Sequence, residues 1–167
     1  MLVLFDTETT SLVSPRLIEM AVWCAGESTP LTYRFRPAED ITFEAMAAHH
    51  ITPEMVSGSP LFKPDMDFLG GISAKEFFEN NVIVAHNAEF DMEVMRNEGI
   101  EIKHWICTKK LAAELYDFDC YSLQYLRYKL WVNTPEMSVN VHPHQAASDV
   151  VVLKALFEKM KGDLLLN

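Results

Sequence analysis

The sequence is poor in the features that place a chain in a membrane or in a disulfide-stabilised fold. No apolar run approaches the roughly 20 residues that a membrane helix needs. No basic segment followed by a cleavable apolar stretch opens the chain. Its 3 cysteines, Cys24, Cys107 and Cys120, are odd in number and lack zinc-finger spacing. We therefore expect free thiols, a reducing cytoplasmic location and no membrane partner.

Basic residues are also scarce. The chain has 14 Lys and Arg against 24 Asp and Glu, which gives a formal net charge of −10. This balance argues against a protein whose main task is to coat a polyanion such as duplex DNA. It leaves open an enzyme that takes one strand end into a local site. Part of the acidic excess can also be metal ligands, whose charge is offset when cations bind.

The 167 residues, 49% of them apolar, are enough for one domain with a buried core. Apolar runs between turn residues predict strands at 2–6, 17–25, 31–36, 82–85 and 105–108. Helical patterns predict helices at 43–48, 53–57, 64–80 with a break at Gly70-Gly71, 88–98, 109–116 and 122–130. A loop over 132–143 then leads to a last helix that ends near 161. This order predicts an α/β fold with a mixed five-stranded sheet flanked by helices.

Two acids directly follow the first apolar run, in the stretch Phe5-Asp6-Thr7-Glu8. Side chains two positions apart on an extended chain project from the same face, so the carboxylates of Asp6 and Glu8 repel each other. Either one of them is protonated or a cation lies between them. The simpler interpretation is that the strand ends at Asp6 and both acids belong to a surface turn.

Two further acids each head an apolar helical stripe. Asp91 lies early in a helix that Asn87 is suited to cap, and apolar residues follow it at +3 and +4. The helix N-terminus favours an acid there, but it does not explain an acid on the inward face. Asp149 heads a longer stripe, with apolar residues at +3, +4, +7, +8 and +11. No Lys or Arg lies one turn along that stripe, so a metal ion is a reasonable partner for this carboxylate.

Taken together, these four carboxylates at strand or helix ends indicate one shared cluster. Enzymes that cleave phosphodiesters hold two divalent ions about 3.5–4 Å apart in such a cluster. Oxygen ligands favour Mg²⁺ or Mn²⁺ over zinc. A zinc site made by His142, His144 and a cysteine is the alternative.

His144 is a further candidate for this cluster. It stands five residues before Asp149, a spacing that places two helical side chains roughly 140° apart. His144 can therefore join Asp149 only from a loop or a first helical turn, and Pro143 favours such a boundary.

Three short motifs occur in order along the chain: FDTETT, VAHNAEFD and HQAASD. They resemble the three exonuclease motifs of the DnaQ-like, or DEDDh, 3′→5′ exonuclease family, and all five chemical positions are intact. Two further stretches, AMAAHHITPEMV and WICTKKLAAELY, are similar to those of the bacterial exodeoxyribonuclease X subfamily. Because that subfamily carries additional C-terminal sequence, residues 1–167 are expected to be the single DEDDh nuclease domain alone.

The resemblance implies a ribonuclease H-like fold and a DNA 3′ end as the partner, with RNA as a second option. It implies hydrolysis of terminal phosphodiester bonds to nucleoside 5′-monophosphates, with two bound ions, Mg²⁺ or Mn²⁺. The implied catalytic residues are Glu8 and His144, with His144 as general base. The implied metal ligands are Asp6, Glu8, Asp91 and Asp149.

The substrate-binding candidates are Thr7, Thr9, Leu12, Val13, His49, Asn87 and Phe90. The backbone of Thr7 and the side chain of Thr9 are placed to meet the terminal sugar and phosphate. Leu12 and Val13 either fold back on the core or stay exposed and wedge against the terminal bases.

The remaining binding candidates come with a structural alternative. His49 matches a histidine that in relatives lies near the substrate. Asn87 is either a binding residue or only a helix cap, and Phe90 either stacks on a base or packs in the core. Basic candidates for phosphate contacts are Arg34, Arg36, Lys109, Lys110, Arg127 and Lys129.

Other functions stay open at this point. An RNA-processing exonuclease, oligoribonuclease-like or ribonuclease T-like, would use the same chemistry and differ in contacts to the 2′-hydroxyl. A proofreading subunit would need a polymerase surface that no motif reveals, and protein partners are unknown. A catalytically silent binding module has no chemical need for paired carboxylates, so the intact set of acids argues against it.

Overall fold

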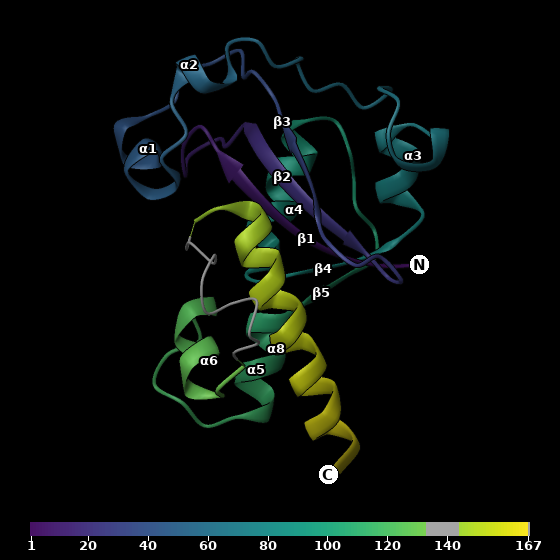
Figure 1. The fold of residues 1–167 in the computed structure, drawn as a ribbon, viewed down its shortest axis with the longest axis vertical. Helices are drawn as coiled ribbons and strands as arrows, with labels where there is room; N and C mark the ends of the chain where they lie inside the picture. Colours follow the sequence, from purple (N-terminus) through teal and green to yellow (C-terminus); the bar gives the residue numbers. More distant parts are fainter. Residues whose placement is uncertain (133–143, 167) are drawn as a thin grey trace.

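The computed structural model describes residues 1–132 and 144–166, in which five strands form one mixed sheet in the order β3-β2-β1-β4-β5 (Figure 1). The strands are β1 (Leu2–Thr9), β2 (Leu17–Cys24), β3 (Leu31–Arg34), β4 (Val82–Ala85) and β5 (Trp105–Cys107). Strand β2 pairs antiparallel with both β1 and β3, whereas β4 pairs parallel with β1 and with β5. The predicted five-stranded mixed sheet is therefore confirmed.

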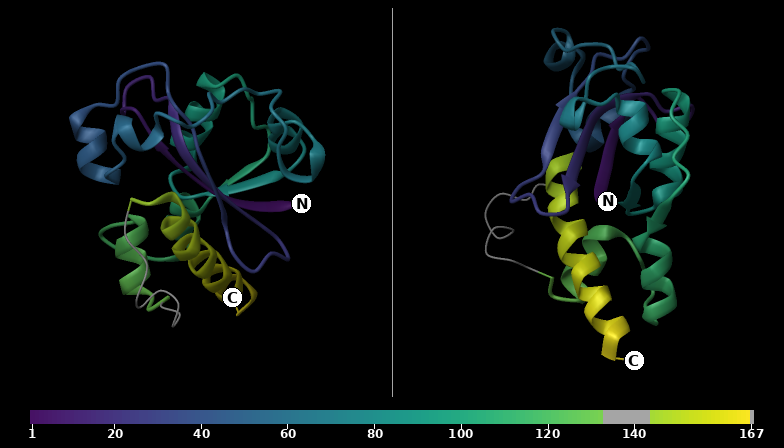
Figure 2. Two further views of the ribbon diagram at one scale, coloured as in Figure 1. Left: turned by 45° about the horizontal axis from the view of Figure 1, so that its top comes forward. Right: turned by 90° about the vertical axis from the view of Figure 1, so that its right-hand side faces the viewer.

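Helices cover both faces of this sheet (Figures 1 and 2). On one face, α3 (Ala74–Glu79) and α4 (Ala88–Asn97) pack against Val3 and Phe5 of β1. On the other face, α5 (Thr108–Leu115), α6 (Leu123–Lys129) and α8 (Ala146–Leu166) pack against Leu4. The short helices α1 (Phe43–His49) and α2 (Pro53–Val56) lie beyond the end of β1. Within the described residues, no helix is both long and apolar enough to cross a membrane.

Strand β1 continues past its apolar run, so the expectation that it ends at Asp6 is wrong. Its antiparallel partner β2 pairs with it from Val3 to Thr9. Its parallel partner β4 pairs only with Leu2 to Leu4. Among the described residues, no strand therefore pairs with this side of β1 from Phe5 onward, while β2 still holds β1 extended. Asp6 and Glu8 lie inside the strand, on the α8 face with Leu4, because side chains alternate between faces.

Two predicted helices differ from the structure. The helix expected over 64–80 is reduced to α3 and a short 3-10 turn, η1 (Leu69–Gly71), because Gly70 and Gly71 adopt positive φ angles of 77° and 75°. Ser73 then caps α3 by accepting a hydrogen bond from the backbone of Glu76 at 3.1 Å. The last helix runs on to Leu166, where Asp163 contacts Lys159 and Tyr116. The predicted loop over 132–143 lies almost wholly outside the described residues.

Phe78 offers a direct test of this core. Its side chain is fully buried and contacts the rings of Phe5, Phe68 and Phe77. The Phe78→Ala change should lower the free energy of unfolding by about 3–5 kcal/mol in urea denaturation, because a cavity replaces the ring. Phe43→Ala is the control, since that ring is 84% exposed. A loss at position 78 no larger than in the control would contradict the described core.

Candidate active site

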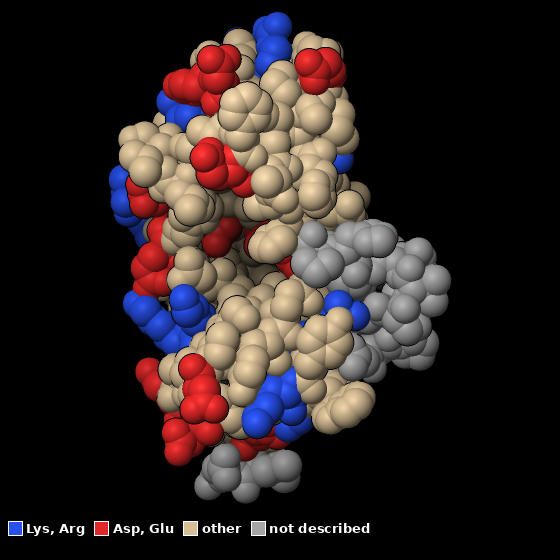
Figure 3. Space-filling model, turned by 90° about the vertical axis from the view of Figure 1, so that its left-hand side faces the viewer, with Lys and Arg blue, Asp and Glu red and all other residues tan. Residues whose placement is uncertain are grey.

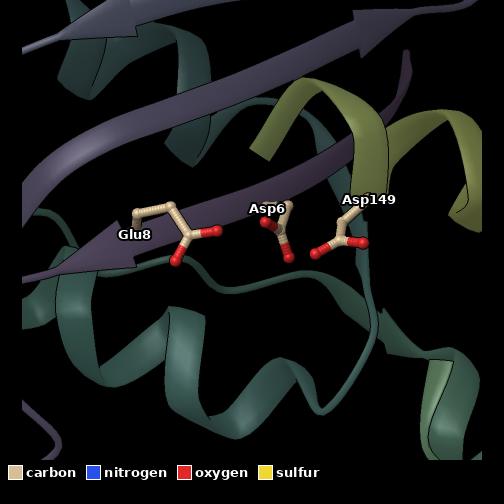
Figure 4. A group of neighbouring side chains, drawn as sticks. All are labelled: Asp6, Glu8 and Asp149. Atoms are coloured by element: carbon tan, nitrogen blue, oxygen red, sulfur yellow. The ribbon is translucent and has the colours of Figure 1, made fainter. Parts of the chain in front are cut away.

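Three carboxylates meet where β1 passes under the start of α8. Asp6 and Glu8 come from β1 and Asp149 from the first turn of α8, and their side chains point toward one another (Figure 4). One oxygen of each lies within 4.8 Å of the other two. The alternation of β1 and the stripe of α8 both direct these acids to the same space. The predicted clustering of these three acids is present in the structure.

Asp91, the fourth predicted acid, is buried beside this group. Because β4 ends at Ala85, α4 begins next to the part of β1 that has no parallel neighbour. Asp91 lies in the first turn of α4, and its Oδ1 accepts a hydrogen bond from the Thr7 hydroxyl at 2.8 Å. Its charge raises the pKa of both Asp6 and Glu8, after the larger effect of burial. Asp91 therefore belongs to the same electrostatic group.

All four carboxylic acids resist ionisation in the metal-free fold. Burial is the main cause and raises the pKa of Asp6 and Asp149, of Glu8 to about 8 and of Asp91 to about 7. Neighbouring negative charges raise the pKa of Asp6 and Glu8 further. Within residues 1–132 and 144–166, no Lys or Arg forms an ion pair with Asp6, Glu8 or Asp91. A group of oxygen ligands with this excess of negative charge fits a divalent cation.

A fifth acid, Glu19, lies directly opposite Glu8 on strand β2. Glu19 is buried, and its charge contributes to the raised pKa of both Asp6 and Glu8. It forms an ion pair with Arg34 of β3, with 2.6 Å between Nε and Oε2. Arg34, a candidate for a phosphate contact, is therefore held against Glu19 instead.

A cavity of about 410 Å³ opens above the acids. Figure 3 shows a hollow on this face with acidic atoms in its depth. The predicted residues that line it are Asp6, Thr7, Glu8, Thr9, Leu12, His49, Asn87, Phe90, His144 and Asp149. Val13 lines a neighbouring cavity of about 350 Å³ together with Arg16 and Asn97. The structure thus brings together most of the predicted site residues, with Asp91 buried behind them and Val13 displaced from them.

The loop that carries Leu12 and Val13 is pinned at its base. Thr10 closes it through two hydrogen bonds with the backbone of Arg16, at 3.0 and 3.1 Å. The hydroxyl of Thr9 donates to the carbonyl of Ser11 at 3.0 Å, so this side chain supports the loop. Leu12 and Val13 are 83% and 82% exposed. The alternative in which these two side chains fold back on the core is therefore wrong.

His49 and Asn87 both line the cavity, and both also form hydrogen bonds within the protein. His49 is buried, and its Nδ1 accepts from the backbone of Ile51 at 3.0 Å. Its Nε2 therefore carries the proton and donates to the carbonyl of Thr9 at 3.1 Å, so both ring nitrogens are used within the protein. Asn87 adopts a positive φ of 63° and does not cap α4 through its side chain. Its Oδ1 accepts from Lys109 at 3.2 Å instead. Phe90 is half-buried and contacts both the core and the cavity.

His144 stands just before α8, as its spacing from Asp149 predicts. It has a positive φ of 60°, is exposed, and lines the cavity. Its backbone N–H donates to Asp149 Oδ2 at 3.0 Å, which ties the histidine to the acid group. His142 of the alternative zinc site lies outside the described residues.

The contact between Gln124 of α6 and Asp149 is not predicted by the sequence. Gln124 Nε2 donates to Asp149 Oδ1 at 2.9 Å. The helical periodicity relates residues within one helix, so it contains no signal that links α6 to α8. Arg127, expected to contact phosphate, is buried beside Gln124.

Comparison with known proteins places this geometry in context. A family model of RNase T-type exonucleases matches residues 3–157. The chain is 35% identical over 161 residues to exodeoxyribonuclease 10 of Escherichia coli (strain K12), which covers 93% of this chain and 66% of that protein. It is 25% identical over 178 residues to the DNA polymerase III subunit epsilon of Rickettsia prowazekii (strain Madrid E), covering 96% of this chain and 73% of that subunit. The chain thus spans just under two thirds of exodeoxyribonuclease 10.

A solved structure of Exonuclease X in complex with 5′ overhanging duplex DNA superimposes with a TM-score of 0.76 at 30% identity. The match covers 97% of this chain and 92% of that one, and it confirms the predicted ribonuclease H-like fold. A second structure, the apo form of a nuclease, matches in fold alone, with a TM-score of 0.61 at 19% identity. Since the family model spans nearly the whole chain and the motifs converge on one cavity, the chain belongs to the exonuclease family of the RNase T and DnaQ type.

Proposed function

We propose that this chain is a metal-dependent 3′→5′ exonuclease that hydrolyses terminal phosphodiester bonds of DNA and releases nucleoside 5′-monophosphates. The observation that carries the proposal is the group of Asp6, Glu8 and Asp149, with oxygens within 4.8 Å of one another at the floor of a cavity. Asp91 lies buried beside them. The family membership makes exonuclease chemistry the expected use of such a group.

In this proposal the four carboxylates hold two divalent ions, Mg²⁺ or Mn²⁺. Such ions supply positive charge that activates water for attack and stabilises the departing 3′-oxygen. Glu8 and Asp149 complete the ligand set from two different elements, so the site forms only when α8 is docked on the sheet. Their raised pKa values mean that protons and cations compete for the same oxygens.

His144 is the proposed general base. Its exposed side chain stands at the wall of the cavity, and its backbone bond to Asp149 holds it near the acids. A neutral imidazole can accept the proton of the attacking water near neutral pH and pass it on to solvent. Because the histidine is not buried, it can exchange that proton after each turnover.

The walls of the cavity suit the end of a strand. A volume of about 410 Å³ lies in the range of small-ligand sites and suits one terminal nucleotide. Phe90 and the exposed Leu12 offer apolar surface to the bases, and α1 closes the cavity beyond Thr9. DNA is proposed as the substrate because the similar proteins include an exodeoxyribonuclease and an Exonuclease X bound to DNA.

The substrate and polarity can be tested in one assay. Single-stranded DNA, duplex DNA with a 5′ overhang and RNA, each labelled at the 5′ end, are incubated with Mg²⁺ or Mn²⁺. A ladder of shortening labelled DNA is expected, with nucleoside 5′-monophosphates as products. Asp6→Asn, the control, should be slower by at least about 100-fold, since even an outer-shell change costs roughly 10- to 100-fold. Preferential degradation of RNA, or release of the label as a mononucleotide in the first step, would contradict the proposal.

The role of His144 can be separated from metal binding. His144→Ala should lower the rate by about 100- to 10,000-fold, the usual contribution of a general base. Binding of Mn²⁺, measured by calorimetry, should change little because the backbone N–H to Asp149 is kept. The exposed His104 provides the control variant, His104→Ala. If His144→Ala abolishes Mn²⁺ binding, His144 is a ligand and the assignment as base is wrong.

The metal-free protein should lose thermal stability as pH rises from about 4.5 to about 8. Burial raises the pKa of Glu8 from 4.5 to about 8 in the folded chain, so the folded state binds this proton more tightly than the unfolded state. The contribution of Glu8 to the free energy of unfolding is therefore fully present below about pH 4.5, and it is lost as Glu8 ionises toward pH 8. Melting temperatures in EDTA across this range check the decline.

Two comparisons sharpen that measurement. Asp6→Asn removes one of the repelling charges, so its decline with pH should be shallower than that of the wild type. Excess Mg²⁺ should raise the melting temperature most at pH 8, where the carboxylates are free of protons. Equal declines in the two proteins, or no effect of Mg²⁺ at pH 8, would argue against a shared cation site.

A further inference from the structure

The sheet orients Asp6 and Glu8, but it does not orient Asp149. The first two acids belong to β1, which β2 holds along its length. Asp149 comes from the first turn of α8, and each of its oxygens accepts one hydrogen bond. Oδ1 accepts from Gln124 Nε2 at 2.9 Å, and Oδ2 accepts from the backbone of His144 at 3.0 Å. The side-chain contact with Gln124 therefore ties the orientation of this carboxylate to α6.

A glutamine amide can do this only if its NH₂ end faces the acid. The two ends of the amide have similar shapes, so space alone does not select one orientation. Arg127 Nη1 donates to Gln124 Oε1 at 3.4 Å. A guanidinium only donates and a carboxylate only accepts, so one amide orientation alone satisfies both neighbours. The charge of Arg127 adds to this preference by attracting the amide oxygen and repelling the NH₂ group.

The position of Arg127 fits this role better than a contact with phosphate. Its side chain is only 6% exposed, and it lies three residues after Gln124, on the same side of α6. A buried guanidinium is unfavourable unless nearby groups compensate its charge. Its positive charge also lowers the pKa of Asp149, against the larger opposing effect of burial. The guanidinium of Arg127 therefore contacts the oxygen end of the Gln124 amide, while Asp149 contacts its NH₂ end.

We propose that Gln124 and Arg127 form a relay that holds the Asp149 carboxylate in the orientation in which it shares a divalent cation with Asp6 and Glu8. The inference rests on the proposed function and deepens it. Gln124 and Arg127 are positioning residues, since they act through Asp149. The relay couples cation affinity to the docking of α6 against α8.

The test is calorimetric titration of the full chain with Mn²⁺ alone, so it does not depend on activity. The variants are Gln124→Met, Arg127→Met and the double variant, and Lys129→Met is the control. Lys129 is exposed on the same helix, so this control removes one positive charge without touching the relay. Gln124→Met should weaken Mn²⁺ binding by roughly 10- to 100-fold, as for other outer-shell partners of metal ligands. Its melting temperature should stay close to that of the control.

The double variant distinguishes a relay from two separate effects. If Arg127 acts through Gln124, the double variant loses no more affinity than the weaker-binding single variant. Losses that multiply would overturn the relay, because Arg127 would then act on its own through its charge. Unchanged Mn²⁺ affinity in Gln124→Met would also overturn it and leave a packing contact between α6 and α8.

The remaining outcomes are also decisive. If Arg127→Met does not fold, the affinity of Gln124→Met still decides whether Gln124 positions Asp149. Wild-type protein that binds no Mn²⁺ would overturn the proposed function itself. Wild-type binding together with an unaffected Gln124→Met would overturn only the relay.

Discussion

Repulsion among carboxylates that are partly or fully buried is the constraint on which the rest of this structure depends. Asp6 and Glu8 lie on the part of β1 that has passed its parallel neighbour β4, and burial with mutual repulsion raises the pKa of both. Such a group is unfavourable without protons or cations. Two apolar clusters, one on each face of the sheet, supply the stability that keeps these acids together.

The acids are held in different ways, and each reflects the element that carries them. Strand pairing with β2 orients Asp6 and Glu8, whereas Asp91 depends on the hydroxyl of Thr7 from the opposite face of β1. Asp149 depends on α6 and on the residue before its own helix. A site assembled from a strand and two helices is therefore sensitive to how the helices dock, and less so to their internal stability.

His49 and His86, which both line the cavity, add little positive charge. Burial lowers the pKa of His49, and it lowers the pKa of His86 to about 4. His86 uses both ring nitrogens, toward the Thr108 hydroxyl at 2.9 Å and the carbonyl of Tyr121 at 2.8 Å. At neutral pH these two rings are uncharged, so they do not compensate the acids. In the proposed function, bound cations, and not the protein surface, would supply the positive charge with which a chain of net charge −10 binds a strand end.

Local periodicity in the sequence was enough to predict that the acids form a cluster. The two-residue spacing of Asp6 and Glu8 and the stripe headed by Asp149 depend only on neighbours along the chain, and these acids meet in the fold. The sheet order and the end of β1 needed the tertiary structure, because β2 extends the strand by pairing from residues far along the chain. The engagement of His49 with Thr9 and of Gln124 with Asp149 likewise joins separate elements. The sequence alone determined which acids share a face or head an apolar stripe, since these patterns follow the backbone. Which groups orient them was decided only by tertiary packing, since contacts through space leave no period in the chain.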